Sequence, residues 1–204
     1  LITTIPDSHK QNAPQLSSII TVIGFGLGPF IGGLIAQFSN QPLVTPYLPI
    51  IAAAILCFFG LFLVKAPQFK VQPFSIAPRL EIPAAQHHSL FFIAGLTAFS
   101  AFGAFSLFAS LSPSFVKDLI PWHGPLVSGS AIASILLVSA VVQFSAKSLL
   151  PAKSLILGLI TLVVSFVLLG LCMSMQWSIL FFISDILVGV GHGLGLLGAF
   201  GLIH

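Results

Sequence analysis

Long apolar segments alternate with short polar connections along this chain. Each segment is nearly free of charge, and most reach the roughly 20 residues that a helix needs to cross a bilayer core. They do not alternate polar with apolar residues, as the short strands of a membrane barrel do. We therefore predict six membrane-crossing helices, over residues 16–38, 47–64, 89–110, 125–146, 154–175 and 178 to the end.

The composition strengthens this prediction. Only 5% of the residues are charged and 57% are hydrophobic, whereas a soluble domain carries about a quarter charged residues. So few charges cannot cover a water-facing surface of a 204-residue chain. We expect an all-α polytopic membrane protein whose main partner is the lipid bilayer. A net charge of +3 without any basic run gives no reason to expect a nucleic-acid partner.

The distribution of charge predicts an orientation. If the N-terminal end is cytoplasmic, Lys117 is the one basic residue outside. The other six then lie inside, as the positive-inside rule expects: Lys10, Lys65, Lys70, Arg79, Lys147 and Lys153. Aromatic residues that favour the headgroup region agree with this orientation, because Tyr47, Trp122 and Trp177 fall near the predicted outer ends.

The first predicted helix contains a glycine–proline string. Gly24, Gly28 and Gly32 recur every four residues, a spacing that forms a groove where another helix can approach closely. Pro29 removes one backbone hydrogen bond, and in lipid the freed carbonyl must be satisfied by neighbours. We expect this helix to pack against protein through its glycine face. On its own, the spacing indicates only a closely packed membrane helix.

The longer string is more specific. Gly24, Gly28, Pro29, Gly32 and Gly33 fit the form G-x(3)-G-P-x(2)-G-G, which resembles the fifth-helix signature of the major facilitator superfamily. A longer form of that signature has another glycine where this chain has Gln15. In the superfamily the signature is associated with proton-driven drug antiporters.

Other segments resemble the same superfamily. Residues 105–115 look like the end of helix seven in bacterial members, and residues 189–195 are similar to its glycine-rich helix ten. The resemblance implies helices five to ten of a twelve-helix fold. Residues 1–64 then end the N-terminal half, 65–88 form the cytoplasmic linker, and 89–204 begin the C-terminal half. It further implies a fragment of a cell-membrane efflux permease, which needs the missing helices of the same chain and does not transport alone.

Asp185 and His192 are the candidate functional residues of the last helix. Asp185 is the one acidic residue inside a predicted span, where a charge costs about 2.5–3.5 kcal/mol. His192 lies nearly two turns further along, on the same face, and Gly189 between them would leave room for water or a ligand. We expect proton coupling or substrate contact. The alternatives are a carboxylate near the outer interface and a histidine that serves packing.

Three further polar residues are candidates for lining a substrate cavity: Ser130, Ser134 and Gln143. Serine is also a common packing residue in membrane helices. A phenylalanine stripe in the third helix, at positions 99, 102, 105 and 108, either lines an apolar cavity or spirals towards lipid. His87 and His88 have no acidic or cysteine residue nearby at ligand spacing, so we expect no metal site there.

Transport is the function that these features favour. The chain has no phosphate-binding G-x-x-x-x-G-K-[ST] string and no constellation typical of hydrolases, so we expect neither a cofactor nor an enzyme. The leading hypothesis is proton-coupled efflux of small amphipathic molecules. The alternatives are a sugar or metabolite permease, a non-transporting receptor or scaffold and, as the least favoured, an intramembrane enzyme that uses Asp185 and His192.

Overall fold

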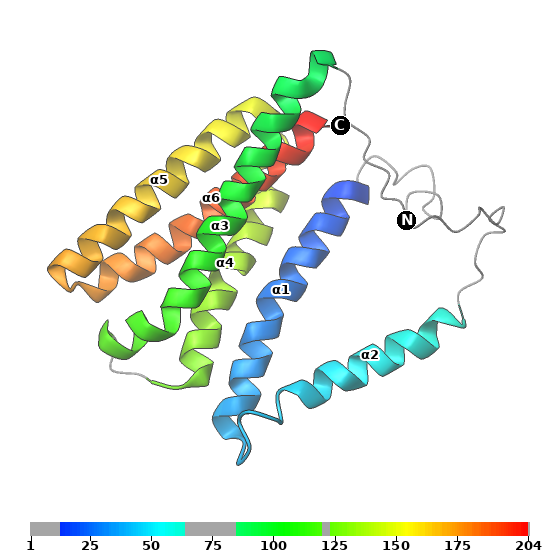
Figure 1. Cartoon of the computed structure of the whole chain (residues 1–204), viewed down its shortest axis with the longest axis vertical. Helices are drawn as coiled ribbons and strands as arrows, with labels where there is room; N and C mark the ends of the chain where they lie inside the picture. The colour runs from blue at the N-terminus through cyan, green and yellow to red at the C-terminus, as the bar shows by residue number, and fades with distance from the viewer. Residues whose placement is uncertain (1–12, 64–84, 120–122, 204) are drawn as a thin grey trace.

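A computed structural model of the chain describes residues 13–63, 85–119 and 123–203, and this part contains helices and no strand. Figure 1 shows the helices in chain order. They are α1 (Ala13–Phe38), α2 (Tyr47–Leu61), the short 3-10 helix η3 (Ala85–His87), α3 (His88–Leu119), α4 (Pro125–Ser145), α5 (Pro151–Met175) and α6 (Ser178–Ile203). The all-α prediction is confirmed for these residues.

Five of the helices, α1 and α3 to α6, are long and apolar enough to cross a membrane. The exception is α2, which has 15 residues and is therefore about 22 Å long, less than the roughly 30 Å of a hydrocarbon core. The sequence predicted six spans, and the second of them was expected over residues 47–64. Its helix ends at Leu61 instead, and residue 64 lies outside the described part.

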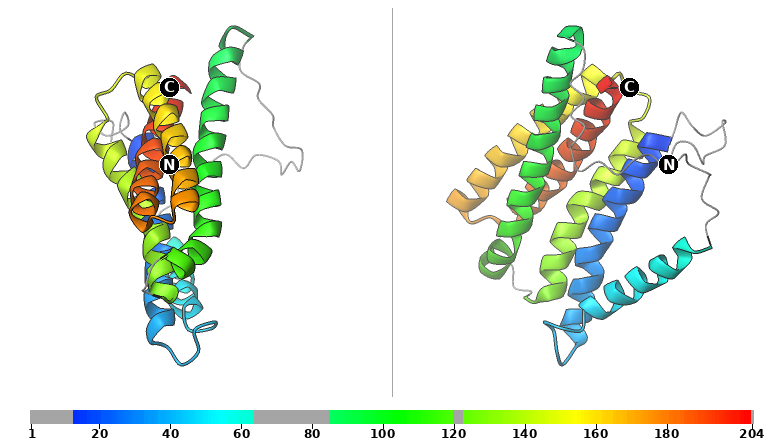
Figure 2. Two further views of the ribbon diagram at one scale, coloured as in Figure 1. Left: turned by 90° about the vertical axis from the view of Figure 1, so that its left-hand side faces the viewer. Right: turned by 45° about the vertical axis from the view of Figure 1, so that its right-hand side comes forward.

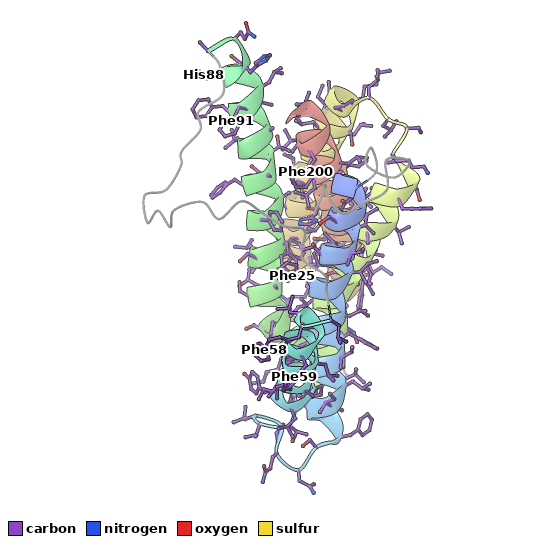
Figure 3. All side chains as sticks on the ribbon, turned by 90° about the vertical axis from the view of Figure 1, so that its right-hand side faces the viewer. Phe25, Phe58, Phe59, His88, Phe91 and Phe200 are labelled. Carbon is purple, nitrogen blue, oxygen red and sulfur yellow. The ribbon has the colours of Figure 1, made fainter. Side chains whose placement is uncertain are left out.

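The core of the bundle is α6, which packs against α3, α4 and α5. Figures 1 and 2 show α6 between these helices, with α1 against α4 on the far side. The remaining helix, α2, turns away from the bundle and has no buried residue. Figure 3 shows phenylalanines projecting from the outer faces of the helices, among them Phe25, Phe58 and Phe59, which are all exposed. An apolar exterior of this kind suits a lipid environment.

The pairs α1 and α4, and α5 and α6, run antiparallel. Pro151 contacts Gly201 at the other end of α6, and Pro125 contacts Gly33 near the end of α1. The α4–α5 connection, which carries Lys147, therefore lies at the opposite end of the bundle from Lys117 at the end of α3. This agrees with the predicted separation of these two charges. Lys10, Lys65, Lys70, Arg79 and Trp122 lie outside the described residues.

Glycines bring α5 and α6 into backbone contact. A Cβ added at Gly158 would lie 2.6 Å from the backbone nitrogen of Gly195, and one added at Gly198 would lie 2.6 Å from that of Leu155. No side chain fits at these points without displacing a helix. Such close approach is how membrane helices gain van der Waals contact where lipid offers no hydrophobic drive.

Some helix ends differ from the predicted bounds. The third apolar span was expected at residues 89–110 and ends at Leu111, but the helix α3 continues through Pro113 to Leu119; proline is tolerated inside membrane helices where other groups satisfy the backbone. The fifth was expected to begin at residue 154, but α5 begins at Pro151, because proline suits the first helical position. Lys153 therefore belongs to the first turn of α5 and not to the connection.

The Gly24–Gly28–Gly32 face, which was expected to pack against protein, has almost no partner among the described residues. A Cβ at Gly24 or Gly28 would meet nothing within 4 Å among the described residues, and one at Gly32 would only touch Pro46. The face that contacts α4 contains Gly26, about two turns before Gly33. Residues seven apart share a helix face, so a helix with this many glycines offers two different small-residue faces.

Candidate functional site

Buried polar side chains meet between α4 and α6. On α6, Asp185 is 3% exposed and His192 is fully buried. On α4, Ser139 and Gln143 are also buried, and Ser134 is half-buried. We refer to these five residues as the polar seam. Burying polar groups in a membrane bundle is costly unless they find partners, so their pairing is informative.

The first pair of the polar seam joins Ser134 and Asp185. The hydroxyl of Ser134 donates to Oδ2 of Asp185. It also lies 2.7 Å from the carbonyl oxygen of Ala131, in its own helix. A hydroxyl has one proton to donate and can also accept. Ser134 can therefore donate to an ionised carboxylate, or donate to the carbonyl of Ala131 and accept from a protonated carboxyl.

The second oxygen of Asp185 is different. Oδ1 is buried and has no hydrogen-bond partner among the described residues. An orphaned buried oxygen costs about 1–3 kcal/mol. The carboxyl of Asp185 is enclosed by the bundle and does not lie on its outer surface.

The second pair of the polar seam joins Ser139 and His192. Oγ of Ser139 lies 2.8 Å from Nδ1 of His192. The amide of Gln143 donates to the same oxygen over 3.3 Å. The other ring nitrogen of His192, Nε2, is buried and without a hydrogen-bond partner in the described part of the chain. The polar seam thus contains two open polar atoms, one on each ionisable residue.

Two phenylalanines of α3 border His192. The ring of Phe102 meets the imidazole edge to face at 5.1 Å between centroids, and Phe105 lies at 6.0 Å. The stripe to which they belong spirals around α3 as its spacing predicts. Phe99 is 75% exposed, Phe102 is 46% exposed, and Phe108 is 1% exposed. The middle of the stripe contacts His192, and its ends face outwards and into the core.

The glycines of α6 explain why the short serine side chains of α4 reach residues of α6. A Cβ at Gly189 would lie 2.6 Å from the carbonyl oxygen of Ile135, and one at Gly193 would lie 2.7 Å from that of Ser139. These contacts bring the two backbones close enough for serine side chains to meet Asp185 and His192. The expectation that Gly189 leaves room for water or a ligand was wrong, because the backbone of α4 fills that space.

Four of the five predicted site residues meet in the polar seam: Ser134, Gln143, Asp185 and His192. Ser130 does not, because its hydroxyl donates to Leu126 in its own helix at 2.7 Å. The sequence analysis missed Ser139, which links Gln143 to His192. Ser139 could be recognised only once the relative direction of α4 and α6 was known. Because these helices run in parallel, the residue that faces His192, seven positions after Asp185, lies on α4 after Ser134, and Ser139 is five positions after it.

Outside the polar seam, the buried polar side chains of the described residues are hydroxyls that donate to backbone carbonyls: Thr97, Ser154, Ser165 and Ser184. His87 lies exposed in η3, within 3.1 Å of the Gln86 amide nitrogen. The described residues contain no group of three or more histidine, cysteine or acidic side chains that could hold a metal ion. The polar seam therefore holds the chemistry that this part of the chain presents.

The sequence matches no protein-family model, and no curated protein or solved structure is significantly similar to it. Function is therefore inferred from the polar seam and from the helices that surround it. The resemblance to the facilitator superfamily stays a prediction from the residues that carry it.

Proposed function

We propose that this chain is part of a secondary transporter that exports small amphipathic molecules in exchange for protons. The single observation that carries the proposal is the burial of Asp185 and His192 between membrane-length helices, each with one open polar atom. Ionisable groups inside membrane helices commonly mark proton relays or substrate pathways. The family proposed is the major facilitator superfamily, through the glycine–proline string that begins at Gly24.

The Ser134–Asp185 pair supports proton exchange in particular. A group that cycles between charged and neutral needs a neighbour that satisfies both forms. Ser134 does so, because its hydroxyl donates to a carboxylate and accepts from a carboxylic acid. A lysine or arginine partner would instead favour only the ionised form. The pairing thus suits a carboxyl that gains and loses a proton during a cycle.

His192 suits contact with a substrate. Its ring lies between a serine and two phenylalanine rings, so it combines a hydrogen-bonding edge with an apolar wall. Small-molecule sites have this composition, with few polar groups among mainly apolar ones. In the proposed transporter, the helices move apart during the cycle and expose Nε2 of His192 and Oδ1 of Asp185.

The arrangement of a larger protein follows from the same proposal. α1 and α2 would close an N-terminal half, and α3 to α6 would open a C-terminal half, with a cytoplasmic linker between them. The open Gly24–Gly28 face would then receive a helix that lies outside this chain. The 204-residue chain would not enclose a transport path, and its partners would be the missing helices, lipid, substrate and protons.

Proton release on substrate addition tests the proposal. The full-length polypeptide that contains this chain is reconstituted in liposomes with a trapped pH indicator, and a panel of lipophilic amines and neutral amphiphiles is added. We expect at least one compound to move across the membrane together with an opposite proton flux. The chain of 204 residues alone should give no flux. Flux without proton movement would indicate a permease, and no flux for any compound would indicate a receptor or scaffold.

A further inference from the structure

The hydrogen bonds from Gln143 through Ser139 to His192 have a direction. The nitrogen Nε2 of Gln143 lies 3.3 Å from Oγ of Ser139, which lies 2.8 Å from Nδ1 of His192. An amide nitrogen can only donate. Oγ of Ser139 is therefore the acceptor towards Gln143, and its own hydroxyl proton is available for another group.

The destination of that proton decides the state of the histidine. The hydroxyls of Ser130 and Ser134 each reach a carbonyl of their own helix, whereas the contacts of Ser139 are with Gln143 and His192. If Ser139 donates to Nδ1, this nitrogen is bare, and the proton of the neutral imidazole is on Nε2. The hydrogen bond at one ring nitrogen thus fixes the chemistry of the other.

We propose that Ser139, supported by Gln143, is a positioning residue that holds neutral His192 with its proton on Nε2. The polar seam then presents two different open groups. Nε2 of His192 is a hydrogen-bond donor and Oδ1 of Asp185 is an acceptor. The two residues are seven positions apart on one face of α6, which corresponds to about 10 Å along the helix.

A donor at His192 and an acceptor at Asp185 together define a class of substrate. This inference rests on the proposed transport function. A matching molecule has a hydrogen-bond acceptor, such as a carbonyl or ether oxygen, that meets Nε2 of His192. It has an amine or another donor about 10 Å away that meets Asp185, and an apolar frame that fits Phe102 and Phe105. A molecule with a donor at both ends would leave the N–H of His192 unpaired and should bind less tightly.

The alternative arrangement, with the proton of His192 on Nδ1, makes a different prediction. If the amide of Gln143 were turned around, its oxygen would accept from Ser139, and Nδ1 of His192 would have to donate to Oγ. Nε2 would then be an acceptor, and the substrate would need a donor at this place. The two arrangements differ in the position of one proton, which nuclear magnetic resonance reads directly.

The test uses the full-length polypeptide in lipid nanodiscs with isotope-labelled histidine, under mildly alkaline conditions that keep imidazole neutral. His192 is assigned as the signal that His192→Gln removes. We expect Nε2 to resonate as a proton-bearing nitrogen and Nδ1 as a bare one. In Ser139→Ala this preference should be lost, and both tautomers should appear. Ser130→Ala, on the same helix, should leave the signal unchanged.

Two results would overturn the proposal: a proton on Nδ1 in the unmodified chain, or an unchanged tautomer in Ser139→Ala. Gln143→Leu is a second variant, which removes the amide donor and should also produce a mixture. The tautomer is measured without any transport. A reversed tautomer would therefore contradict only the inferred substrate class. An absence of flux would contradict the proposed function, and the tautomer could still be measured.

Discussion

Ser134 on α4 donates a hydrogen bond to Asp185 on α6, across a separation of 51 positions in the sequence. The pair of Ser139 and His192 spans 53 positions, so the two contacts follow each other in the same order along two parallel helices. Together they fix the register of α4 against α6. They also place Asp185 and His192 on one helix interface.

Removing the hydroxyl of Ser134 should destabilise the bundle. Ser134→Ala leaves both carboxyl oxygens of Asp185 buried without a partner, and we expect a loss of about 1–3 kcal/mol in the free energy of unfolding. Ser130→Ala is the matched control, because its hydroxyl bonds only within its own helix, and it should change stability by less than about 0.5 kcal/mol. Reversible unfolding in mixed micelles measures both. Equal effects would show that the Ser134–Asp185 bond is not formed.

The contact between α5 and α6 should depend on Gly158 of α5 and not on Gly170 of the same helix. Gly158→Ala places a Cβ 2.6 Å from the backbone of Gly195, and we expect a loss of about 1–3 kcal/mol from the forced separation of the helices. A Cβ at Gly170 of α5 meets nothing within 4 Å among the described residues. Gly170→Ala should therefore be neutral or slightly stabilising. Thermal unfolding in detergent compares them, and the reverse order of stability would mean that α5 faces α6 differently.

The two glycine faces of α1 should behave differently. Gly33→Ala brings a methyl group against the backbone of Pro125 and Leu126, so it should weaken the packing of α1 on α4. Gly28→Ala should be silent in the chain, since nothing described lies within 4 Å of it. In the full-length polypeptide Gly28→Ala should also destabilise if a further helix covers that face. Thermal unfolding of both proteins checks this, and a silent Gly28→Ala in the full-length form would argue against the proposed family.

Cysteine labelling should place the helix connections on opposite sides of the membrane. Asn40→Cys lies between α1 and α2, and Ser148→Cys lies between α4 and α5; both positions are exposed. In a background with Cys57→Ala and Cys172→Ala, we expect an impermeant maleimide to label position 148 from the cytoplasm and position 40 from outside. Labelling from one side only would contradict the membrane topology, and a swapped pattern would reverse the predicted orientation.

Much of the fold could be predicted because the length of an apolar segment is the main indicator of a membrane-crossing helix. Five helices were expected where they occur, since apolar runs this long have few alternatives in a membrane. Helix ends were less accurate. Pro113 does not end α3, and Pro151 begins α5 earlier than its apolar run indicates. Both depend on which backbone groups find partners, and the local sequence does not determine this.

The site was predictable where a residue conflicts with its surroundings. Asp185 and His192 stand out in an apolar helix, so they were found from sequence. Ser139 does not stand out, because serine is ordinary in membrane helices, and its role depends on the parallel register of α4 and α6. Gly189 was misread for a related reason. A missing side chain leaves space either for a ligand or for another backbone, and only the packing decides between them.

Asp185→Asn tests the central claim most directly. Asparagine has nearly the same shape and can still bond Ser134, so the bundle should fold, but it cannot exchange a proton. With the full-length polypeptide in liposomes, we expect an imposed pH gradient to drive substrate movement in the unmodified protein and not in Asp185→Asn. Substrate exchange without a gradient should persist in Asp185→Asn with a lower affinity, because the asparagine amide still offers an oxygen to the substrate's donor. Gradient-driven movement that persists in Asp185→Asn would contradict the assignment of proton coupling to the polar seam.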